Sequence, residues 1–297
     1  MTTPRVAVDV EGRQLSLSNL DKVLYPDGFT KGQVLDYYTR ISPVLLPHLA
    51  GRPLTRIRFP NGVEGGSFFE KNAPNNTPEW VRTARLPAPG SSRDREMIDY
   101  VVCDELATLI WTANLAGLEL HTPMWRVGGS AAAAHALAPD LAVVDLDPGP
   151  PATIVECCAV AQLVRAETDL AWLPKTSGSK GMQLYAPLRA GASSEQVRED
   201  VRALAVRLER AHPDLVVSRM TKSLRPGKVL LDWSQNTAAK TTVSVYSLRA
   251  RPTPTVSTPL TWDEVEACAR PEDLVFRADD VLDRVQRHGD LFTPLLA

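Results

Sequence analysis

Three aspartates stand at the ends of apolar segments, and their spacing is typical of a metal site. Asp145 and Asp147 close one such segment, and Asp232 closes another that begins at Val229. On a strand, residues two apart point to the same face, so we expect Asp145 and Asp147 to project side by side while Leu146 enters the core. Adjacent carboxylates repel each other unless a cation lies between them, and hard oxygen ligands favour Mg²⁺ or Mn²⁺.

A plainer interpretation of Asp145 and Asp147 is a solvated strand end that runs into a turn, because Asp and Pro are common turn residues. The D-x-D pair alone therefore decides little. The third strand-end carboxylate, Asp232, favours the metal site. Three converging carboxylates are what two-metal phosphoryl or nucleotidyl transfer requires, since paired cations stabilise the attacking and leaving oxygens.

The segment 175–181 (KTSGSKG) concentrates hydroxyls, glycines and two lysines. Glycines let backbone N–H groups turn toward one point, the hydroxyls of Ser177 and Ser179 donate, and Lys180 adds a cation, so the segment suits phosphate oxygens. It is neither a Walker A loop nor a nucleophile elbow, because G-x-x-x-x-G-K-[ST] and G-x-S-x-G are both absent. A polar hairpin turn is the alternative interpretation.

Cationic and amide side chains flank Asp232 on both sides. Arg225 precedes it, and Gln235 and Arg249 follow. Such groups beside a metal site neutralise a triphosphate, and Arg grips two oxygens at once, although a solvated basic face remains the alternative. The further cations of this region are Arg219, Lys222, Lys228 and Lys240. His121 lies on a possible strand, where a lone histidine is more often structural.

The elements that must position these residues alternate irregularly. Hydrophobic periodicity, caps and turn residues predict helices at 31–50, 105–116, 153–167 and 193–212, strands at 52–59, 141–146, 184–187, 229–233 and 242–248, and two short helices within 262–296. This mixture favours an α+β fold. The alanine run 131–134 beside Gly128-Gly129-Ser130 predicts a division of the single catalytic domain 1–297 into subdomains 1–127 and 135–297.

The composition excludes a disordered or fibrous chain, since 44% of the 297 residues are apolar and 23% are charged. The formal charge of -2 provides no global positive field, so a polyanion has to be held by a local basic patch. No apolar run approaches the roughly 20 residues that span a bilayer, and we expect a cytoplasmic protein without a membrane partner. The four cysteines lack disulfide or zinc spacing, which predicts buried thiols.

The order Asp145-x-Asp147, then Ser177-Gly178-Ser179-Lys180-Gly181, then Asp232 resembles the three motifs of the archaeo-eukaryotic primase superfamily. More narrowly, the chain resembles the polymerase domain of the bacterial end-joining DNA ligase D. The resemblance covers nearly the whole chain, through the segments 18–26 (SNLDKVLYP), 51–53 (GRP), 58–62 (RFPNG), 68–71 (FFEK), 119–121 (ELH), 145–149 (DLDPG) and 232–236 (DWSQN).

The resemblance implies a catalytic cleft between two mixed or antiparallel sheets flanked by helices. It makes Asp145, Asp147 and Asp232 the catalytic metal ligands of a two-metal Mn²⁺ or Mg²⁺ site. The nucleotide-binding residues that it implies are His121, Ser177, Ser179, Lys180, Arg225, Gln235 and Arg249. The residues that it implies for DNA are Asn19, Lys22 and Lys31 at a 5′-phosphate, Phe68 and Phe69 on template bases, and Arg58.

The implied activity is the addition of ribonucleotides or deoxynucleotides to a primer 3′-hydroxyl, in non-homologous end joining or gap-filling repair. The implied partners are DNA ends with a 5′-phosphate, NTP or dNTP, a Ku-like end binder and a separate DNA ligase, in the nucleoid. Two alternatives stay open: a non-catalytic end-binding module that recruits a ligase, and a metal-dependent nuclease. The chain departs from the family at Gln183, where many relatives carry histidine, and at Ile57, where some carry lysine.

Overall fold

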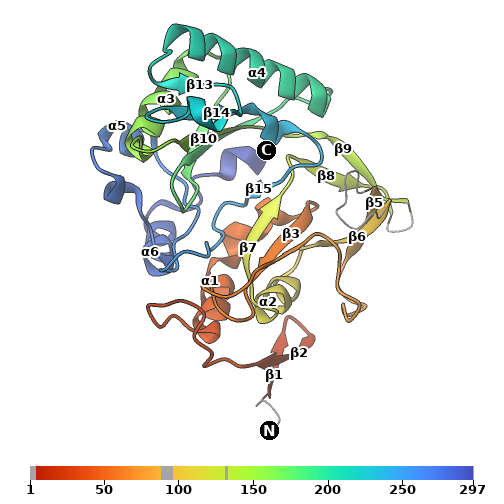
Figure 1. Ribbon diagram of the computed structural model, residues 1–297. Coiled ribbons are helices and arrows are strands. Elements are labelled where there is room, and N and C mark those ends of the chain that lie inside the picture. Colours follow the sequence, from red (N-terminus) through yellow and green to blue (C-terminus); the bar gives the residue numbers. More distant parts are fainter. Residues whose placement is uncertain (1–4, 88–95, 131–132, 297) are drawn as a thin grey trace.

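Two sheets lie near the centre of the molecule and carry helices on opposite sides (Figure 1). The computed structural model describes residues 5–87, 96–130 and 133–296. Helices α1 and α2 accompany the sheet built mainly from the first half of the chain, and α3 and α4 cover the sheet of the second half. The mixed α+β architecture predicted from the sequence is confirmed.

The first sheet has six strands, all paired antiparallel, in the order β15-β7-β3-β6-β5, with β4 added beside β3. Helix α1 begins after Thr30, whose hydroxyl and the Gln33 side chain form a capping box. The elements are β3 (Pro53–Arg58), β4 (Phe68–Glu70), β5 (Thr83–Pro87), β6 (Met97–Val102), β7 (Gly117–Thr122), β15 (Thr242–Val243), α1 (Lys31–Leu49) and α2 (Leu106–Asn114).

The second sheet has five strands in the order β11-β12-β10-β14-β13, antiparallel except for the pair β13 and β14. Its central strand β10 is apolar on the face that meets α3 and α4, which closes a second hydrophobic core. The elements are β10 (Leu141–Pro148), β11 (Leu173–Thr176), β12 (Met182–Pro187), β13 (Val216–Val217), β14 (Val229–Asp232), α3 (Ile154–Ala166) and α4 (Ser194–Ala211).

The remaining elements are short. Two hairpins are formed by β1 (Arg5–Val10) with β2 (Arg13–Ser18), and by β8 (Trp125–Gly128) with β9 (His135–Pro139). The other helices are α5 (Trp262–Ala267), α6 (Ala278–His288) and the 3-10 turns η2 (Lys222–Leu224), η3 (Trp233–Asn236), η4 (Pro271–Leu274) and η5 (Thr293–Leu296). In the described ranges, no helix is long and apolar enough to cross a membrane.

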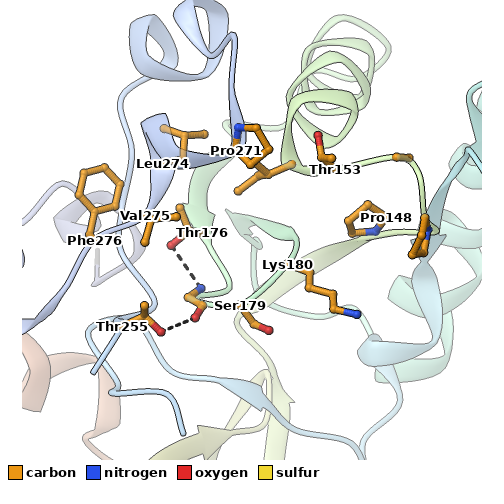
Figure 2. A pocket seen from close by; sticks show the side chains of 14 residues that line it. Pro148, Thr153, Thr176, Ser179, Lys180, Thr255, Pro271, Leu274, Val275 and Phe276 are labelled. Carbon is orange, nitrogen blue, oxygen red and sulfur yellow. Dashed lines mark hydrogen bonds between the residues drawn. The ribbon is translucent and has the colours of Figure 1, made fainter. Parts of the chain in front are cut away.

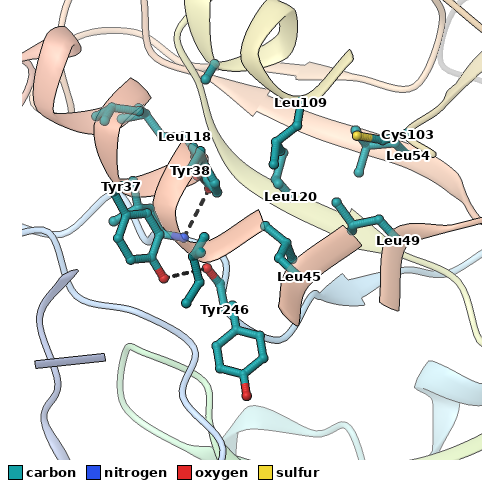
Figure 3. Packing of buried hydrophobic residues seen from close by; sticks show 14 of the residues in the cluster. Tyr37, Tyr38, Leu45, Leu49, Leu54, Cys103, Leu109, Leu118, Leu120 and Tyr246 are labelled. Atoms are coloured by element: carbon teal, nitrogen blue, oxygen red, sulfur yellow. Dashed lines mark hydrogen bonds between the residues drawn. The ribbon is translucent and has the colours of Figure 1, made fainter. Parts of the chain in front are cut away.

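The chain returns to the first core after β15, and this return corrects one prediction. A strand was expected over 242–248, but the ladder stops at Val243 because the backbone turns and Tyr246 takes a positive φ of 62°. The turn is held by α1: the Tyr37 hydroxyl donates to the Tyr246 carbonyl at 2.8 Å, and the Leu248 amide donates to the Tyr38 hydroxyl at 3.1 Å (Figure 3).

The other predicted elements agree with the structure to within about two residues at their ends. Cys103, Cys157 and Cys158 are buried thiols, as predicted, and Cys268 is half-buried. The division into 1–127 and 135–297 stays a prediction, and Ala131 and Ala132 of the alanine run lie outside the described residues. Strand β15 of the second segment pairs with β7 of the first, so the two segments share a sheet.

Candidate active site

The three aspartates meet on two neighbouring strands. In the antiparallel pair of β10 and β14, Asp145 lies directly opposite Asp232, and Asp147 lies two residues farther along β10, opposite Leu230. Leu146 between them is fully buried, whereas the side chain of Asp147 is 54% exposed. The prediction that Asp145 and Asp147 share a face while Leu146 enters the core is confirmed, and Asp232 joins them.

Each carboxylate is held by its own donor. Gln183 Nε2 donates to Asp145 Oδ1 at 3.0 Å, and Gln235 Nε2 donates to Asp232 Oδ2 at 2.9 Å. Arg225 Nη1 lies 3.6 Å from Asp147 Oδ2. Consequently, in the part of the chain that the structure describes, no three His, Cys, Asp or Glu side chains converge as the ligands of a metal ion do.

The donor set nevertheless fits a hard divalent cation. Three carboxylates stand at neighbouring positions of two paired strands, Asp145 directly opposite Asp232 and Asp147 two residues along the same strand, and carboxylate oxygens are the ligands that such cations prefer. Burial, together with the charges of Asp232 and Asp147, raises the pKa of Asp145 to about 6. A cation between these groups would relieve the repulsion that this shift reflects. The residues present thus fit Mg²⁺ or Mn²⁺ by ligand chemistry and by backbone position.

An open cavity of about 310 Å³ lies beside Asp145 and Asp147, between the two sheets. It gathers residues that the sequence analysis assigned to the nucleotide from four separate stretches of chain. They are His121, Ser177, Ser179, Lys180, Gln235 and Arg249. Asp232 and Arg225 do not line this cavity: the carboxylate of Asp232 turns to Ser234 and Gln235, and Arg225 donates to the Met220 carbonyl at 2.7 Å.

The segment 175–181 forms the hairpin turn between β11 and β12, as the alternative interpretation predicted, and its residues border the cavity; phosphate binding by this turn stays a prediction. The Ser177 hydroxyl accepts hydrogen bonds from the amides of Ser179 and Gly181, each at 3.2 Å. The amide of Gly178, a residue with a φ of +66°, donates to Thr176 Oγ1 at 3.3 Å. The prediction that these amides point freely at a ligand is therefore wrong, because the turn uses them itself.

The exposed groups of this turn are the side chains of Ser179 and Lys180, for which the structure shows no hydrogen-bond or ion-pair partner within the described ranges. They also border a second, largely apolar cavity of about 280 Å³ on the other side of the turn. Figure 2 shows Lys180 extending between Ser179 and Pro148, with Pro271, Leu274 and Phe276 on the far wall. The Thr255 hydroxyl anchors the turn by donating to the Gly178 carbonyl at 2.7 Å.

His121 and Arg249 are joined by Glu119, a buried carboxylate that the sequence analysis left without a role. His121 Nε2 lies 3.0 Å from Glu119 Oε2, and because a carboxylate only accepts, Nε2 carries the proton. Arg249 Nε lies 3.1 Å from Glu119 Oε1, and its Nη1 donates to the Ser177 carbonyl at 2.5 Å. Burial lowers the pKa of His121. Glu119 thus fixes two cavity side chains and, through Arg249, the turn.

We expect Glu119 to make stability depend on acid. Burial alone would raise its pKa, but the hydrogen bond from His121 and the charge of Arg249 lower it to about 2, against about 4.3 in an unfolded chain. A depressed folded-state pKa gives stability that is complete above pH 5 and is lost as the pH falls toward 2, about 3 kcal/mol in all. The free energies of unfolding of wild type and Glu119→Gln, measured with denaturant, should differ most above pH 5 and become equal near pH 2. A constant difference would contradict this assignment.

Two cations expected near a triphosphate point elsewhere. Arg219 pairs with Glu209 at 3.2 Å, and Lys228 Nζ donates to the Pro213 carbonyl at 2.5 Å, so both serve the β13–α4 side of the sheet. Lys240 Nζ donates to the Ser234 hydroxyl. Spacing along the chain brought these residues near Asp232, but side-chain direction separates them from the cavity. Arg219 and Lys228 do not line this cavity, which favours the alternative of a solvated basic face for these two residues.

The residues expected at a 5′-phosphate surround the start of α1. Lys22 is exposed, and its Nζ donates to the Pro60 carbonyl at 2.5 Å. Lys31 is buried, its Nζ donates to the Ser18 carbonyl at 2.5 Å, and burial lowers its pKa to about 8. Asn19 is exposed with a positive φ of 55°. The structure brings the three into one region, where Lys22 and Asn19 are the accessible members.

Phe68 and Phe69 are 54% and 61% exposed on β4, as residues that stack on bases must be. The strand is held by Glu70, which lies 2.7 Å from Arg58 Nη1 and 3.5 Å from the buried Arg56. Arg58 Nε also donates to the Leu115 carbonyl at 2.7 Å. The structure therefore places Arg58 as a support of the aromatic strand, and a DNA contact for it stays a prediction.

The sequence analysis missed the residues that fix the aspartates from behind. Asn236 is buried, and its amide bonds both the N–H and the C=O of Val143, at 2.9 and 2.8 Å, which pins the turn after Asp232 to β10. Lys175 is 1% exposed and donates to Gln183 at 2.6 Å, whereas Ser179 and Lys180 of the same segment border the cavity. The signal for Asn236 was its place four residues after Asp232, whereas nothing in the local pattern around Lys175 indicated burial.

Comparison with known proteins agrees on one family. The profile of the family described as "LigD, primase-polymerase domain" matches residues 30–292. The chain is 46% identical over 287 residues, 95% of its length, to the multifunctional non-homologous end joining protein LigD of Mycolicibacterium smegmatis, and 31% identical over 281 residues, 93% of its length, to the bifunctional LigD of Bacillus subtilis. It spans only 36% and 43% of those two proteins.

A solved structure is similar over almost its entire length. The polymerase domain from Mycobacterium tuberculosis ligase D, determined in complex with DNA, superposes with a TM-score of 0.88 at 42% identity. The match covers 95% of the present chain and 98% of that domain. The matched region therefore includes both sheets.

Proposed function

The chain belongs to the LigD primase-polymerase family, and from that premise we propose that it adds nucleotides to a primer 3′-hydroxyl at DNA ends that carry a 5′-phosphate. It is an enzyme of the nucleotidyltransferase class, as its family is. The names of its relatives support a place in non-homologous end joining, and the DNA in the similar polymerase structure supports DNA as the substrate.

One observation carries the proposal: a cavity of about 310 Å³ combines acidic strand ends on one wall with cationic and hydroxyl side chains on another. Asp145 and Asp147 suit divalent cations, and Lys180, Ser179 and Arg249 suit the oxygens of a polyphosphate. A nucleoside triphosphate with its cations needs both kinds of wall at once. A protein that only bound DNA ends would need the second alone.

We assign Asp145, Asp147 and Asp232 as the ligands of Mn²⁺ or Mg²⁺, which when bound would activate the 3′-hydroxyl and neutralise the leaving pyrophosphate. Gln183 and Gln235 orient two of these carboxylates. Lys180 and Ser179 would hold the phosphates against the turn, and Arg249, fixed by Glu119, would close the same wall. The chain needs no nucleophile of its own, because the primer hydroxyl attacks the α-phosphorus in line.

The test is primer extension on DNA with a gap whose downstream strand carries a 5′-phosphate, in Mn²⁺ or Mg²⁺, with rNTP or dNTP. We expect metal-dependent incorporation, and a comparison of rNTP with dNTP measures the sugar preference of the chain. A folded protein that incorporates nothing in either metal would overturn the proposal. Loss of end-labelled DNA without added nucleotides would instead identify a nuclease. We further propose that the chain binds a Ku-like protein and a separate DNA ligase. Pull-down with the purified partners tests both interactions.

Lys22 gives a prediction for the DNA end. We expect Lys22→Ala to lower the preference for a 5′-phosphorylated over an unphosphorylated downstream strand about 10-fold, because a charge-assisted hydrogen bond to phosphate is lost. Its exposed position predicts an unchanged melting temperature. The measurement is nucleotide incorporation on substrates with a phosphorylated and with an unphosphorylated downstream strand. Arg40→Ala, on the exposed face of α1, is the control. Equal preference in wild type and Lys22→Ala would refute the assignment of Lys22.

A further inference from the structure

Four residues form a straight row across the second sheet. Lys175 on β11 lies opposite Gln183 on β12, Gln183 lies opposite Asp145 on β10, and Asp145 lies opposite Asp232 on β14. Cross-strand partners in register point to the same face of a sheet, so the four side chains stand next to one another in this order. The row runs from a buried cation to the proposed metal ligands.

Hydrogen bonds join the first three members of this row. Lys175 Nζ donates to Gln183 Oε1 at 2.6 Å, and Gln183 Nε2 donates to Asp145 Oδ1 at 3.0 Å. Gln183 is buried, at 4% exposure, and so is Lys175. The amide therefore has a cation on its oxygen side and a carboxylate on its nitrogen side, which is the one orientation that satisfies both neighbours.

The lysine fixes that orientation because its ammonium donates hydrogen bonds and accepts none. Besides Gln183, its ammonium donates to the Val243 carbonyl at 3.0 Å and to Ser257 Oγ at 2.6 Å, while the Ser257 hydroxyl gives its own proton to the Thr176 carbonyl. Three acceptors use all three N–H groups of an ammonium. A donor-only neighbour forbids the flipped amide, which would turn Nε2 toward Lys175 and an oxygen toward Asp145.

We propose that Lys175 is a positioning residue of the active site, which through Gln183 holds the Asp145 carboxylate with Oδ1 occupied and Oδ2 free for a divalent cation. The structure shows no hydrogen-bond partner for Oδ2 among the described residues, and Asp145 borders the cavity. The proposal rests on the proposed metal site.

A double-mutant cycle tests the chain of contacts. We expect Lys175→Met and Gln183→Met each to weaken Mn²⁺ binding 3- to 10-fold, measured by electron paramagnetic resonance of free Mn²⁺ with the purified full chain. Because the proposed route from Lys175 to Asp145 runs through Gln183, the double variant should bind Mn²⁺ nearly as Gln183→Met does, apart from the smaller direct effect of the lysine charge on Asp145. Losses that multiply, or a folded Lys175→Met that binds Mn²⁺ as wild type does, would overturn the proposal.

Ser257→Ala is the matched control, because it removes another acceptor of the same ammonium and leaves Gln183 in place. It should lower the melting temperature without changing Mn²⁺ affinity, and a loss of affinity equal to that of Lys175→Met would make the role of Lys175 structural.

A second measurement leaves the lysine untouched and covers the case in which Lys175→Met does not fold. The side-chain amide protons of Gln183, assigned by their absence in Gln183→Met, should exchange slowly with solvent in NMR spectra of wild type; exchange as fast as that of an exposed glutamine overturns the proposal.

The two proposals fail separately. A wild-type protein that binds Mn²⁺ with coupled variants but extends no primer overturns the proposed function and leaves the positioning role standing. Extension by wild type together with uncoupled variants overturns the positioning role alone. Absence of Mn²⁺ binding by wild type overturns both.

Discussion

Asp147→Ala should abolish nucleotide addition, by about 10³-fold or more, while the protein still folds and binds DNA ends. The carboxylate is a proposed metal ligand, and metal ions supply several kcal/mol of transition-state stabilisation, each 1.4 kcal/mol being a factor of ten in rate. Its side chain is half exposed, and its one ion pair, to Arg225 at 3.6 Å, is too long to matter for folding. Single-turnover primer extension and fluorescence anisotropy of labelled DNA measure the two properties.

Asp99→Ala is a matched control for this variant, because Asp99 is a comparably exposed strand carboxylate that pairs with Arg85 at 3.5 Å in the other sheet. It should leave extension unchanged. Loss of extension together with end binding in Asp147→Ala would assign the residue to DNA contact instead. Full extension by Asp147→Ala would remove the metal site from the proposal, and a non-catalytic end-binding module would then describe the protein better.

Lys180→Ala should raise the KM for the incoming nucleotide about 30- to 100-fold. The ammonium is exposed at the mouth of the cavity without a partner in the described ranges, so its removal leaves no buried group unpaired and the fold intact. Charge-assisted hydrogen bonds to phosphate contribute about 2–3 kcal/mol, which corresponds to this range. Steady-state extension with varied nucleotide concentration at saturating primer measures it.

The expected pattern is specific to nucleotide binding: in Lys180→Ala the KM for the nucleotide rises, while the affinity for DNA stays as in wild type. Arg207→Ala removes an exposed cation on α4 that pairs with Glu167 at 3.3 Å, and it should change neither the KM for the nucleotide nor the DNA affinity. A fall in kcat with KM unchanged would show that Lys180 acts on the transition state alone. Unchanged kinetics would place the phosphates elsewhere, with the second cavity beside the turn as the next place to examine.

The sequence predicted the acidic centre well because period-2 alternation fixes which strand residues share a face. Asp145 and Asp147 needed only that rule, and Asp232 needed only the observation that it ends an apolar strand. Their convergence depends on β10 and β14 being neighbours, which periodicity does not specify. For that step the resemblance to a known family carried the argument.

Side-chain direction at turns and strand edges was the part that spacing left undetermined. Lys175 and Lys180 are five residues apart in one polar segment, yet one is saturated by three acceptors inside the protein and the other is exposed. Arg219 and Lys228 likewise found partners on the far side of their sheet. The direction of the Lys175 side chain depends on acceptors from residues distant in the chain, such as Val243 and Ser257. A local sequence pattern carries no information about such acceptors.

The Ser177 hydroxyl, which accepts two amides of its own turn, has a consequence for affinity. Together with Thr176 and Thr255 it folds the β11–β12 turn before any phosphate arrives. In the proposed function, a nucleotide would meet a preorganised template, and little of its binding free energy would be consumed in restricting backbone motion. Discrimination among nucleotides would then come from the side chains at the rim of the cavity, while the main chain beneath them keeps its own hydrogen bonds.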